Sequence, residues 1–317
     1  MTDQAPRLRS RLAPSPTGAL HLGNARTFAI NWALARQRSW ELVLRIEDLD
    51  HPRVKPDTID LTREDLAWLG LDWDLELPLQ STDLVAAHEA MRRVAQLGRA
   101  FPCNLTRREV EAAQSAPHGR DAGVRYEPEL RPEGAGRPIQ APDLDGTWRF
   151  LVRPEIEVVD DCVQGPHAFN LAESVGDFPI WTSSGPAYQL AVAVDDARHG
   201  ISDVVRGDDL LPSAARQQAL LRTLGRPTPR WWHVPLVRGE DGRRLAKRHG
   251  DSRLATFRSR GVEPGRIMAL IARWSGIDLA DRCHLSARQF AEEFRIERLP
   301  DADITMTQED LSWLLHG

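Results

Sequence analysis

The hydrophobic pattern of the first 70 residues predicts strands that alternate with helices. Buried strands are expected over 9–12 and over 41–50 (ELVLRIEDLD), where the apolar alternation ends in acidic residues. Helices are expected over 24–36 and over 57–69, the second behind a proline that favours a first helical turn. A strand, a glycine-containing turn, a helix and a second strand are typical of the start of a parallel α/β sheet.

The rest of the chain shows loop-like, sheet-like and helical patterns in turn. A loop-rich stretch over 115–146 is expected to be an insertion between two halves of the sheet domain. Beyond residue 251 the pattern is helical. The other expected elements are strands over 147–154 and 229–237, a strand, a turn and a short strand over 187–207, and a helix over 213–224.

Length and composition indicate an ordinary globular protein. A chain of 317 residues can bury a large core and divide into two or three domains. Charged residues make up 27% and hydrophobic residues 41% of it, as in other soluble proteins. No run of about 18 apolar residues predicts a membrane span, and the polar N-terminus lacks the apolar core of a signal peptide. We therefore expect a cytoplasmic protein without a membrane partner.

The basic residues are almost all arginine. A net charge of −5 argues against a generic nucleic-acid coat but allows a local basic surface. Only two of the 41 basic residues are lysines, Lys55 and Lys247. Because arginine stands wherever a generic positive charge suffices, each remaining lysine is a candidate for a specific role.

The three cysteines, Cys103, Cys162 and Cys283, are scattered along the chain, and none belongs to a CxxC pair. Neither a disulfide framework nor a standard zinc site is therefore predicted. Small buried hydrophobic side chains are the favoured interpretation for all three.

Residues 13–24, APSPTGALHLGN, are too broken by proline and glycine for an ordinary helix or strand. The prolines stiffen the segment, and Gly18 and Gly23 allow a close approach. The helix that follows presents N–H groups and a positive dipole end to an anion, and His21 can donate a hydrogen bond to a phosphate oxygen. A structural turn with a helix-capping histidine is the alternative, and it is preferred for this motif alone.

Residues 239–251, GEDGRRLAKRHGD, form a second candidate motif. They predict a glycine-bounded loop that carries Arg243, Arg244, Lys247 and Arg248. A solvated basic loop is the usual interpretation of such a charge run. The rare lysine favours a functional one, because a compact ammonium suits a phosphoryl group whose charge changes during a reaction.

Together the two motifs resemble the two signatures of class I aminoacyl-tRNA synthetases. The segments RLAPSPTGALHLGNARTF, LRIEDLD, AVAVDDARHGISDVVRGDDLL and RRLAKRHG resemble the glutamyl branch, and the likeness runs through most of 9–275. It implies an α/β fold, a Rossmann-like class I catalytic domain with a parallel sheet, an inserted connective segment and a C-terminal helical region. The expected division is 1–100 and 148–237 for the two catalytic halves, 101–147 for the insert, and 238–317 for the signature loop and a helical, stem-contact-like region.

The resemblance implies activation of glutamate with ATP and Mg²⁺ to glutamyl-adenylate, followed by acyl transfer to RNA. The glutamate carboxylate attacks the α-phosphate in line, so the protein contributes mainly positioning and charge stabilisation. His21 and Lys247 are the expected catalytic residues, and Leu236 would offer backbone groups to adenine. The implied ATP site is His21, Gly23, Asn24, Leu236 and Lys247, and the signature residues are Pro14, Asn24, Arg244, Leu245, Ala246, Lys247 and Arg248.

A site for free glutamate needs a carboxylate for the α-ammonium and a cationic fork for the side-chain carboxylate. By resemblance Glu47 supplies the first, and Arg11 and Arg206, with the Tyr188 hydroxyl, supply the second. Burying Arg206 of VVRG without a charged partner would be costly, so this arginine favours glutamate over glutamine. The implied glutamate site is Arg11, Leu12, Ala13, Pro14, Ser15, Glu47, Tyr188 and Arg206.

Structural roles remain open for several of these side chains. Glu47 could cap a helix, and Tyr188 could belong to the core. The pair Asp195–Asp196 is equally compatible with a strand-ending turn and with the rim of the RNA and active site.

The number of residues after the basic loop indicates which branch of the family the chain resembles. Roughly 65 residues follow His249, which leaves room for a few helices but for no anticodon-binding domain. A short chain with this catalytic body resembles the glutamyl paralogues that attach glutamate to the queuosine base in the anticodon of tRNA(Asp). The expected partners are therefore L-glutamate, ATP and queuosine-containing tRNA(Asp), and a monomer is expected.

Two departures from the family pattern change the expectations. The family's inserted segment often carries a zinc site made by a CxC pair, a tyrosine and a later cysteine. This chain keeps Cys103 and Tyr126 but has Leu105 and Leu130 at the other two positions, so no zinc is expected. Ala246 replaces the usual serine of the basic signature, which is expected to affect the rate more than the reaction.

Three alternatives remain open at this point. The first is a truncated or discriminating glutamyl-tRNA synthetase that charges a tRNA 3′ end. The second is a non-catalytic paralogue that binds RNA or an amino acid. The third is a small nucleotidyltransferase of the HxGH type, against which Glu47, Tyr188 and Arg206 argue.

Overall fold

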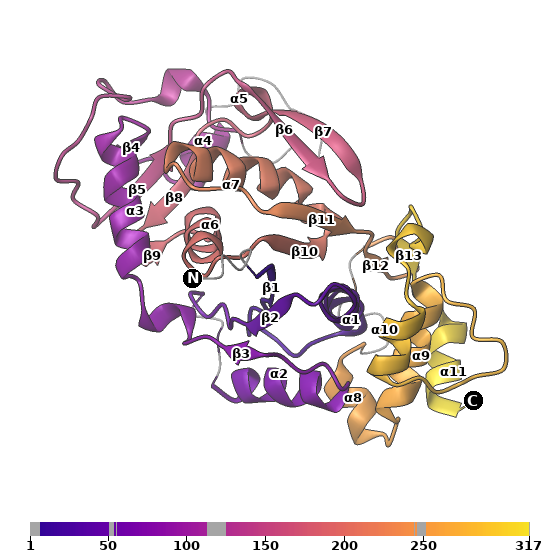
Figure 1. Cartoon of the computed structure of the whole chain (residues 1–317). Helices are drawn as coiled ribbons and strands as arrows, with labels where there is room; N and C mark the ends of the chain where they lie inside the picture. Colours follow the sequence, from indigo (N-terminus) through magenta and orange to yellow (C-terminus); the bar gives the residue numbers. More distant parts are fainter. Residues whose placement is uncertain are drawn as a thin grey trace, which may run out of the picture.

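Two parallel sheets form the centre of the computed structural model, which describes residues 7–50, 54, 56–112, 125–243, 245 and 252–316. The Ser202 N–H, directly before β10, donates to the Arg9 carbonyl of β1 at 2.9 Å, so the sheets adjoin along these strands (Figure 1). One sheet contains the parallel strands β1 (Arg9–Leu12), β2 (Glu41–Leu44) and β3 (Leu75–Glu76). The other contains the parallel strands β10 (Asp203–Gly207), β11 (Arg230–Val234) and β6 (Ile156–Asp161), with β7 (Gly165–Asn170) antiparallel to β6.

The expected α/β class is confirmed, as are the early helices. The helix expected over 24–36 is α1 (Leu22–Gln37), and that expected over 57–69 is α2 (Pro56–Trp68). The helix expected over 213–224 is α7 (Leu211–Thr223). Strand β2 ends at Leu44, earlier than expected, and the Arg45 side chain that follows it pairs with buried carboxylates.

The expectation for 187–207 is wrong in its first half. Instead of a strand, the segment begins with helix α6 (Tyr188–Arg198), and β10 follows. Every residue from Leu190 to Asp196 is buried, because α6 packs against α3 (Val85–Gln96), α7 and a neighbouring strand. A helix buried on all sides has no polar face, so periodicity cannot separate its apolar run from a strand.

An antiparallel sheet crosses the domain boundary that the sequence predicts at residue 147. Strand β4 precedes the loop-rich stretch, and its partners follow it, so the insert packs as one unit with chain on both sides of 147. Trp148 and Phe150 of β5 are buried in the core that this unit shares with α6 and α7. The strands are β4 (Ala100–Cys103), β5 (Thr147–Phe150), β8 (Phe178–Thr182) and β9 (Gly185–Pro186), with the short helices α4 (Arg107–Ala112) and α5 (Leu171–Ser174) nearby.

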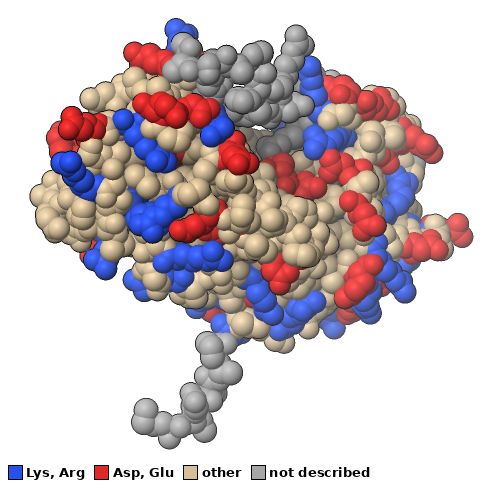
Figure 2. Space-filling model, turned by 90° about the horizontal axis from the view of Figure 1, so that it is seen from above, with Lys and Arg blue, Asp and Glu red and all other residues tan. Residues whose placement is uncertain are grey.

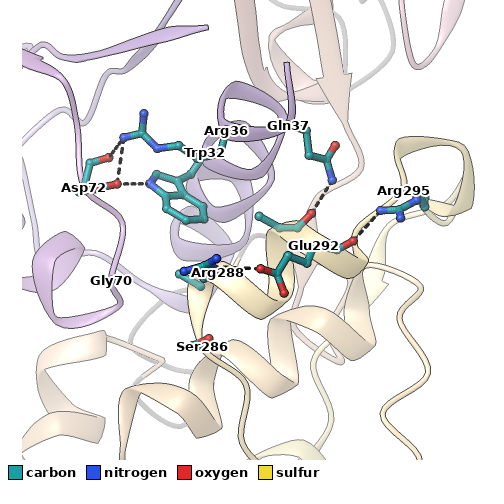
Figure 3. Close-up of a pocket in the computed structure, with 11 residues that line it drawn as sticks. Trp32, Arg36, Gln37, Gly70, Asp72, Ser286, Arg288, Glu292 and Arg295 are labelled. Carbon is teal, nitrogen blue, oxygen red and sulfur yellow. Dashed lines mark hydrogen bonds and ion pairs between the residues drawn. The ribbon is translucent and has the colours of Figure 1, made fainter. Parts of the chain in front are cut away.

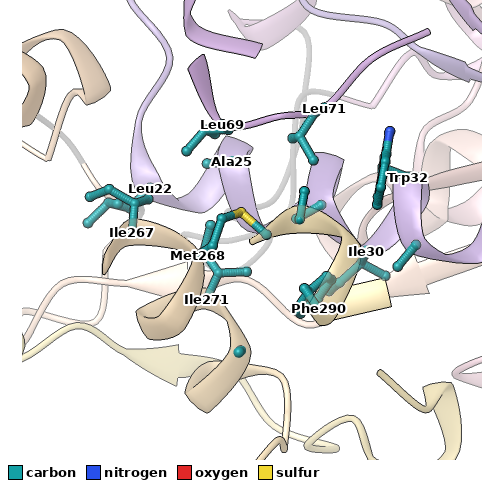
Figure 4. Close-up of a cluster of buried hydrophobic side chains, with 14 of the residues drawn as sticks. Leu22, Ala25, Ile30, Trp32, Leu69, Leu71, Ile267, Met268, Ile271 and Phe290 are labelled. Carbon is teal, nitrogen blue, oxygen red and sulfur yellow. The ribbon is translucent and has the colours of Figure 1, made fainter. Parts of the chain in front are cut away.

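The C-terminal part is helical, as expected, and it shares a core with α1. Figure 4 shows Ile267, Met268 and Ile271 of α9 among side chains of α1 such as Leu22 and Ala25. One continuous hydrophobic cluster therefore joins the sheet domain to this region. Its elements are α8 (Leu254–Ser259), α9 (Pro264–Trp274), α10 (Ala287–Glu293) and α11 (Gln308–His316), with the short strands β12 (Val237–Arg238) and β13 (Ile304–Thr305).

The surface carries mixed charge on the face that Figure 2 shows. Acidic and basic side chains are interspersed there and do not gather into one large basic patch. None of the helices in the described part of the chain combines the length and the apolar character needed to cross a bilayer.

Candidate active site

A cleft of about 240 Å³ opens at the carboxyl ends of β1 and β10, beside the first turn of α1. Ligands of open α/β sheets bind at this edge. The cleft brings together ten residues that the sequence analysis selected: Arg11, Ala13, His21, Gly23, Asn24, Glu47, Tyr188, Arg206, Leu236 and Leu245. It adds seven that the analysis missed: Thr27, Phe28, Val205, Gly207, Asp209, Leu210 and Val237.

A larger hollow, of about 920 Å³, lies between the second half of α1 and α10 (Figure 3). Its polar groups largely bond one another. The Trp32 indole N–H donates to Asp72 at 2.7 Å, and the Gln37 amide donates to two α10-side carbonyls, those of Ala291 and Phe294. Because its polar groups do not converge on the empty space, this hollow is a weaker candidate for a substrate site.

His21 caps α1, which is the alternative that the sequence analysis names, so its ring takes N–H groups that the phosphate interpretation directs to an anion. Its Nδ1 accepts hydrogen bonds from Gly23 N at 3.1 Å and Asn24 N at 3.3 Å, and Asn24 Oδ1 accepts from His21 N. A Cβ on Gly23 would lie 3.0 Å from the imidazole, so glycine gives the ring its place. With Nδ1 as acceptor, the proton of a neutral ring sits on Nε2.

The chain on either side of the basic loop borders the same cleft. Leu245 is buried in the cleft wall. On the other side, the Ser252 carbonyl accepts from Leu22 N at 3.0 Å, and Leu254 N donates to the Leu20 carbonyl at 2.9 Å. Leu245 and Ser252 therefore both lie near the capped turn. Four predicted signature residues lie outside the described residues: Arg244, Ala246, Lys247 and Arg248.

A buried ionic network underlies one wall of the cleft. Asp196 accepts from Arg45 at 2.7 Å and from Arg11 at 3.2 Å, and Arg45 also donates to Glu47 Oε1 at 2.9 Å. Burial would raise the pKa of Asp196, but the charges of Arg45 and Arg11 lower it. Burial raises the pKa of Glu47 despite the same two arginines. Arg11 and Glu47 are therefore fixed in orientation where they meet the cleft.

The pair Asp195–Asp196 forms neither a strand-ending turn nor an exposed rim. Both residues lie in the buried second half of α6. Asp195 accepts from the Gln80 amide at 2.6 Å and pairs with Arg198 one turn later. Their position follows from the helix that the sequence analysis missed, and Asp196 is the acceptor shared by Arg45 and Arg11 in the network.

Arg206, at the end of β10, has no acidic partner among the described residues. Its Nε donates to His233 Nε2 at 3.0 Å, its Nη1 to Gln217 Oε1 at 2.9 Å and its Nη2 to the Leu210 carbonyl at 3.3 Å. A guanidinium has five N–H donors, so two have no acceptor in the described chain. Burial lowers the pKa of Arg206 to about 10. Because Arg206 lines the cleft beside the half-exposed Tyr188, a ligand carboxylate can take the two open donors.

Leu236 corrects an expectation, because its backbone is already bonded within the chain. Its N–H donates to Asp303 Oδ1 at 2.7 Å, and its carbonyl accepts from Ile304 N at 2.8 Å. Its side chain lines the cleft and folds over Gly207, where a Cβ would come within 2.6 Å of a Leu236 methyl group. Leu236 thus contributes an apolar wall.

Three residues expected at the glutamate site do not line the cleft: Leu12, Pro14 and Ser15. Leu12 is fully buried in the core, and Ser15 is exposed. The Pro14 carbonyl accepts from Glu47 N at 3.0 Å, so this turn positions Glu47 through the backbone. Contact between these three residues and glutamate stays a prediction.

Sequence reasoning missed three charged or polar residues behind the cleft: Arg45, Asp161 and His233. All three are buried. The available signal was a polar residue inside an apolar strand, as in WWHV, which needs a bonded partner when buried.

The residues at the position where the family often carries zinc do not fit a metal. Tyr126 donates its hydroxyl proton to the Leu130 carbonyl at 2.7 Å, and Arg149 Nε points at Cys103 Sγ at 3.4 Å. Leu105 packs against this apolar corner. A cationic guanidinium beside the thiol, with leucines for two ligands, does not make a closed zinc site. Among the described residues, no group of three or more His, Cys, Asp or Glu side chains could hold an ion.

Comparison with known proteins places this geometry in a family context. The family described as "tRNA synthetases class I (E and Q), catalytic domain" matches residues 7–313. The Glutamyl-Q tRNA(Asp) synthetase of Rhodopirellula baltica is 44% identical over 279 residues, 84% of each chain. The enzyme of that name from Symbiobacterium thermophilum is 38% identical over 98% of this chain and 99% of its own. A crystal structure of glutamate-tRNA synthetase from Elizabethkingia anophelis shares the fold, with a TM-score of 0.80 at 24% identity over 97% of this chain and 70% of its own.

Proposed function

The chain belongs to the class I tRNA synthetase family for glutamate and glutamine, and from this premise we propose its reaction. The enzyme activates L-glutamate with ATP and transfers the glutamyl group to the queuosine base in the anticodon of tRNA(Asp). It is a ligase of the class I type. The two relatives that carry the matching name support this acceptor, since one of them corresponds to this chain over nearly its whole length.

The two open donors of Arg206 are the observation that carries the proposal. Within the described chain this buried guanidinium is bonded to neutral acceptors, so it keeps its positive charge for a ligand. The glutamate side-chain carboxylate satisfies both donors, whereas the amide of glutamine would meet them with one oxygen and an NH₂ group. The substrate is therefore glutamate.

The opposite end of the amino acid binds at Glu47. Only Oε1 of this carboxylate is hydrogen-bonded within the described chain, to Arg45. Oε2 can accept from the α-ammonium, and the Pro14 carbonyl fixes the Glu47 backbone. Arg11 and Tyr188 complete the wall around the substrate.

ATP occupies the part of the cleft next to the capped turn. We propose that His21, with Nε2–H directed to the triphosphate, and Lys247 from the basic loop hold the phosphates during in-line attack by the glutamate carboxylate. Gly23 and Asn24 belong to this turn, and Leu236 covers the nucleotide with its side chain. Mg²⁺ arrives with ATP, bound by its phosphates. We place the reaction in the cytoplasm and expect a monomer.

The first experiment measures glutamate-dependent ATP–pyrophosphate exchange without tRNA. Wild type is expected to be far more active with glutamate than with glutamine. Arg206→Met is expected to lose about 100-fold or more in kcat/KM for glutamate, because an ion pair in a buried site is removed. Its melting temperature should change little, because removal of the buried charge offsets the loss of the three hydrogen bonds that Arg206 donates. Arg222→Met, on the solvent side of α7, is the matched control and should keep full activity. Equal activity of Arg206→Met and wild type would refute the assignment.

The second experiment identifies the acceptor. Labelled glutamate is incubated with ATP and with tRNA(Asp) that either carries or lacks queuosine. Transfer to the queuosine-containing tRNA alone, with the label on the anticodon base, is expected. Label at the 3′ end would favour a glutamyl-tRNA synthetase, and binding without any exchange would favour a non-catalytic paralogue.

A further inference from the structure

Behind Arg206, a chain of buried side chains crosses three neighbouring strands. Arg206 of β10 donates to His233 Nε2 at 3.0 Å, and His233 Nδ1 of β11 lies 2.6 Å from Asp161 Oδ2 at the end of β6. These strands lie side by side in one sheet (Figure 1). The side chains of His233 and Asp161 are fully buried, and neither lines the cleft.

The hydrogen bonds allow one protonation state for His233. Nε2 accepts from a guanidinium that cannot give up its proton, so the ring hydrogen sits on Nδ1 and is donated to Asp161. Asp161 is itself fixed, since its Oδ1 accepts from the N–H groups of Val163 and Gln164 at 2.9 Å. Burial lowers the pKa of His233, and the charges of Arg206 and Arg11 act in the same direction, while Asp161 opposes them. The ring is therefore a neutral acceptor.

We propose that His233, held in one tautomer by Asp161, is the positioning residue that fixes Arg206 for the substrate carboxylate and keeps its charge unneutralised. The inference rests on the proposed function, because it concerns the same glutamate site. A carboxylate in place of His233 would pair with Arg206 and weaken its attraction for substrate. An apolar residue in place of His233 would leave the Nε–H of Arg206 without an acceptor, and the guanidinium could then rotate.

Two substitutions of His233 separate its two hydrogen bonds. Asparagine places its amide near the Nδ1 position and can keep the bond to Asp161, whereas glutamine reaches the Nε2 position and can keep the bond to Arg206. His233→Asn is expected to raise KM for glutamate by about tenfold or more, with KM for ATP within about twofold of wild type. His233→Gln is expected to keep KM for glutamate within about threefold of wild type.

Discrimination against glutamine gives a second readout. The ratio of kcat/KM for glutamate to that for glutamine should fall in His233→Asn and persist in His233→Gln. If His233 were needed only for folding, its substitution would alter KM for glutamate and KM for ATP together. His167→Asn, on the neighbouring strand β7, is the control, since its imidazole bonds the nearby Gly165 carbonyl at 3.0 Å.

The results distinguish a failure of the positioning role of His233 from a failure of the proposed function. A wild-type protein without glutamate-dependent exchange would overturn the proposed function itself. An active wild type, with a folded His233→Asn variant of unchanged KM for glutamate, would overturn the positioning role alone. Should His233→Asn fail to fold, Asp161→Asn replaces it, because an amide no longer dictates the tautomer. That variant is expected to raise KM for glutamate about threefold or more, and an unchanged value would count against the inference.

Discussion

Asp65 of α2 shows how a single unsatisfied carboxylate can set stability without taking part in the reaction. Its side chain is fully buried, and neither oxygen accepts a hydrogen bond from a described residue. Arg258 lies 3.7 Å away, too far to offset the loss of water. Burial raises the pKa of Asp65 to about 6, above the ordinary value of 3.8. The folded state therefore binds this proton more tightly than the unfolded state does.

The sign of the effect on stability follows from this shift. Between about pH 4 and 6 the folded state holds the proton that the unfolded state has lost, so this group favours folding less as the pH rises. Asp65→Asn is expected to raise the free energy of unfolding at pH 7.5 by about 1–2 kcal/mol. The gain should shrink toward pH 4. Urea unfolding of both proteins across this range measures it, with exposed Asp60→Asn on the same helix as the control. A gain that is equal at pH 4 and pH 7.5 would contradict the argument.

Among the elements, α1, α2 and α7 were predicted as helices from the sequence, and α6 was not. The ends of the three predicted helices fall within three residues of the expected ones. Seven consecutive residues of the run YQLAVAVDDAR, from Leu190 to Asp196, are buried, and its valines favour a strand locally. Packing against α3 and α7, which lie far away in sequence, decides in favour of the helix.

The candidate site also contains residues that the sequence predicted and residues that it did not. Arg11, Glu47, Tyr188 and Arg206 belong to recognisable motifs, and the structure places all four around one cleft. The residues that hold them could not be found by pattern, because their partners are distant in sequence. Arg45 bonds a residue 151 positions away, and His233 bonds one 72 positions away. The sequence offered helix capping by His21 as an alternative, but the choice between a cap and an anion site depends on the side-chain orientation.

Asp303, next to the short strand β13, fixes the position of Leu236, which we propose to lie over the nucleotide. Asp303, next to β13, accepts from Leu236 N at 2.7 Å and pairs with Arg238. Because these contacts fix Leu236 over the cleft, Asp303→Ala is expected to raise KM for ATP about five- to twentyfold and to leave KM for glutamate within about twofold. Exchange kinetics with each substrate varied in turn measure this split. Exposed Asp301→Ala is the control. A lower KM for ATP would show that Asp303 competes with the nucleotide for Leu236 N–H.

At the scale of the molecule, the core that α1 shares with α9 and α10 makes the C-terminal helices part of the catalytic fold. Ile271 is fully buried in this cluster, together with Leu22 at the start of α1 (Figure 4). Leu22 follows His21 directly and bonds Ser252 beyond the basic loop. Loss of packing around Ile271 therefore reaches the turn that forms the cleft, although Ile271 does not line it.

Ile271→Ala is expected to lower the free energy of unfolding by about 2–5 kcal/mol, the range for a buried aliphatic side chain that leaves a cavity. Because one core spans both regions, circular dichroism and glutamate-dependent exchange should lose their signals at the same urea concentration. Both midpoints should move together in the variant, whereas exposed Glu292→Ala on α10 should move neither. If the exchange midpoint stayed at its wild-type value while the helical signal unfolded earlier, the C-terminal helices would form an independent unit. The coupling of the shared core to the catalytic turn would then be wrong.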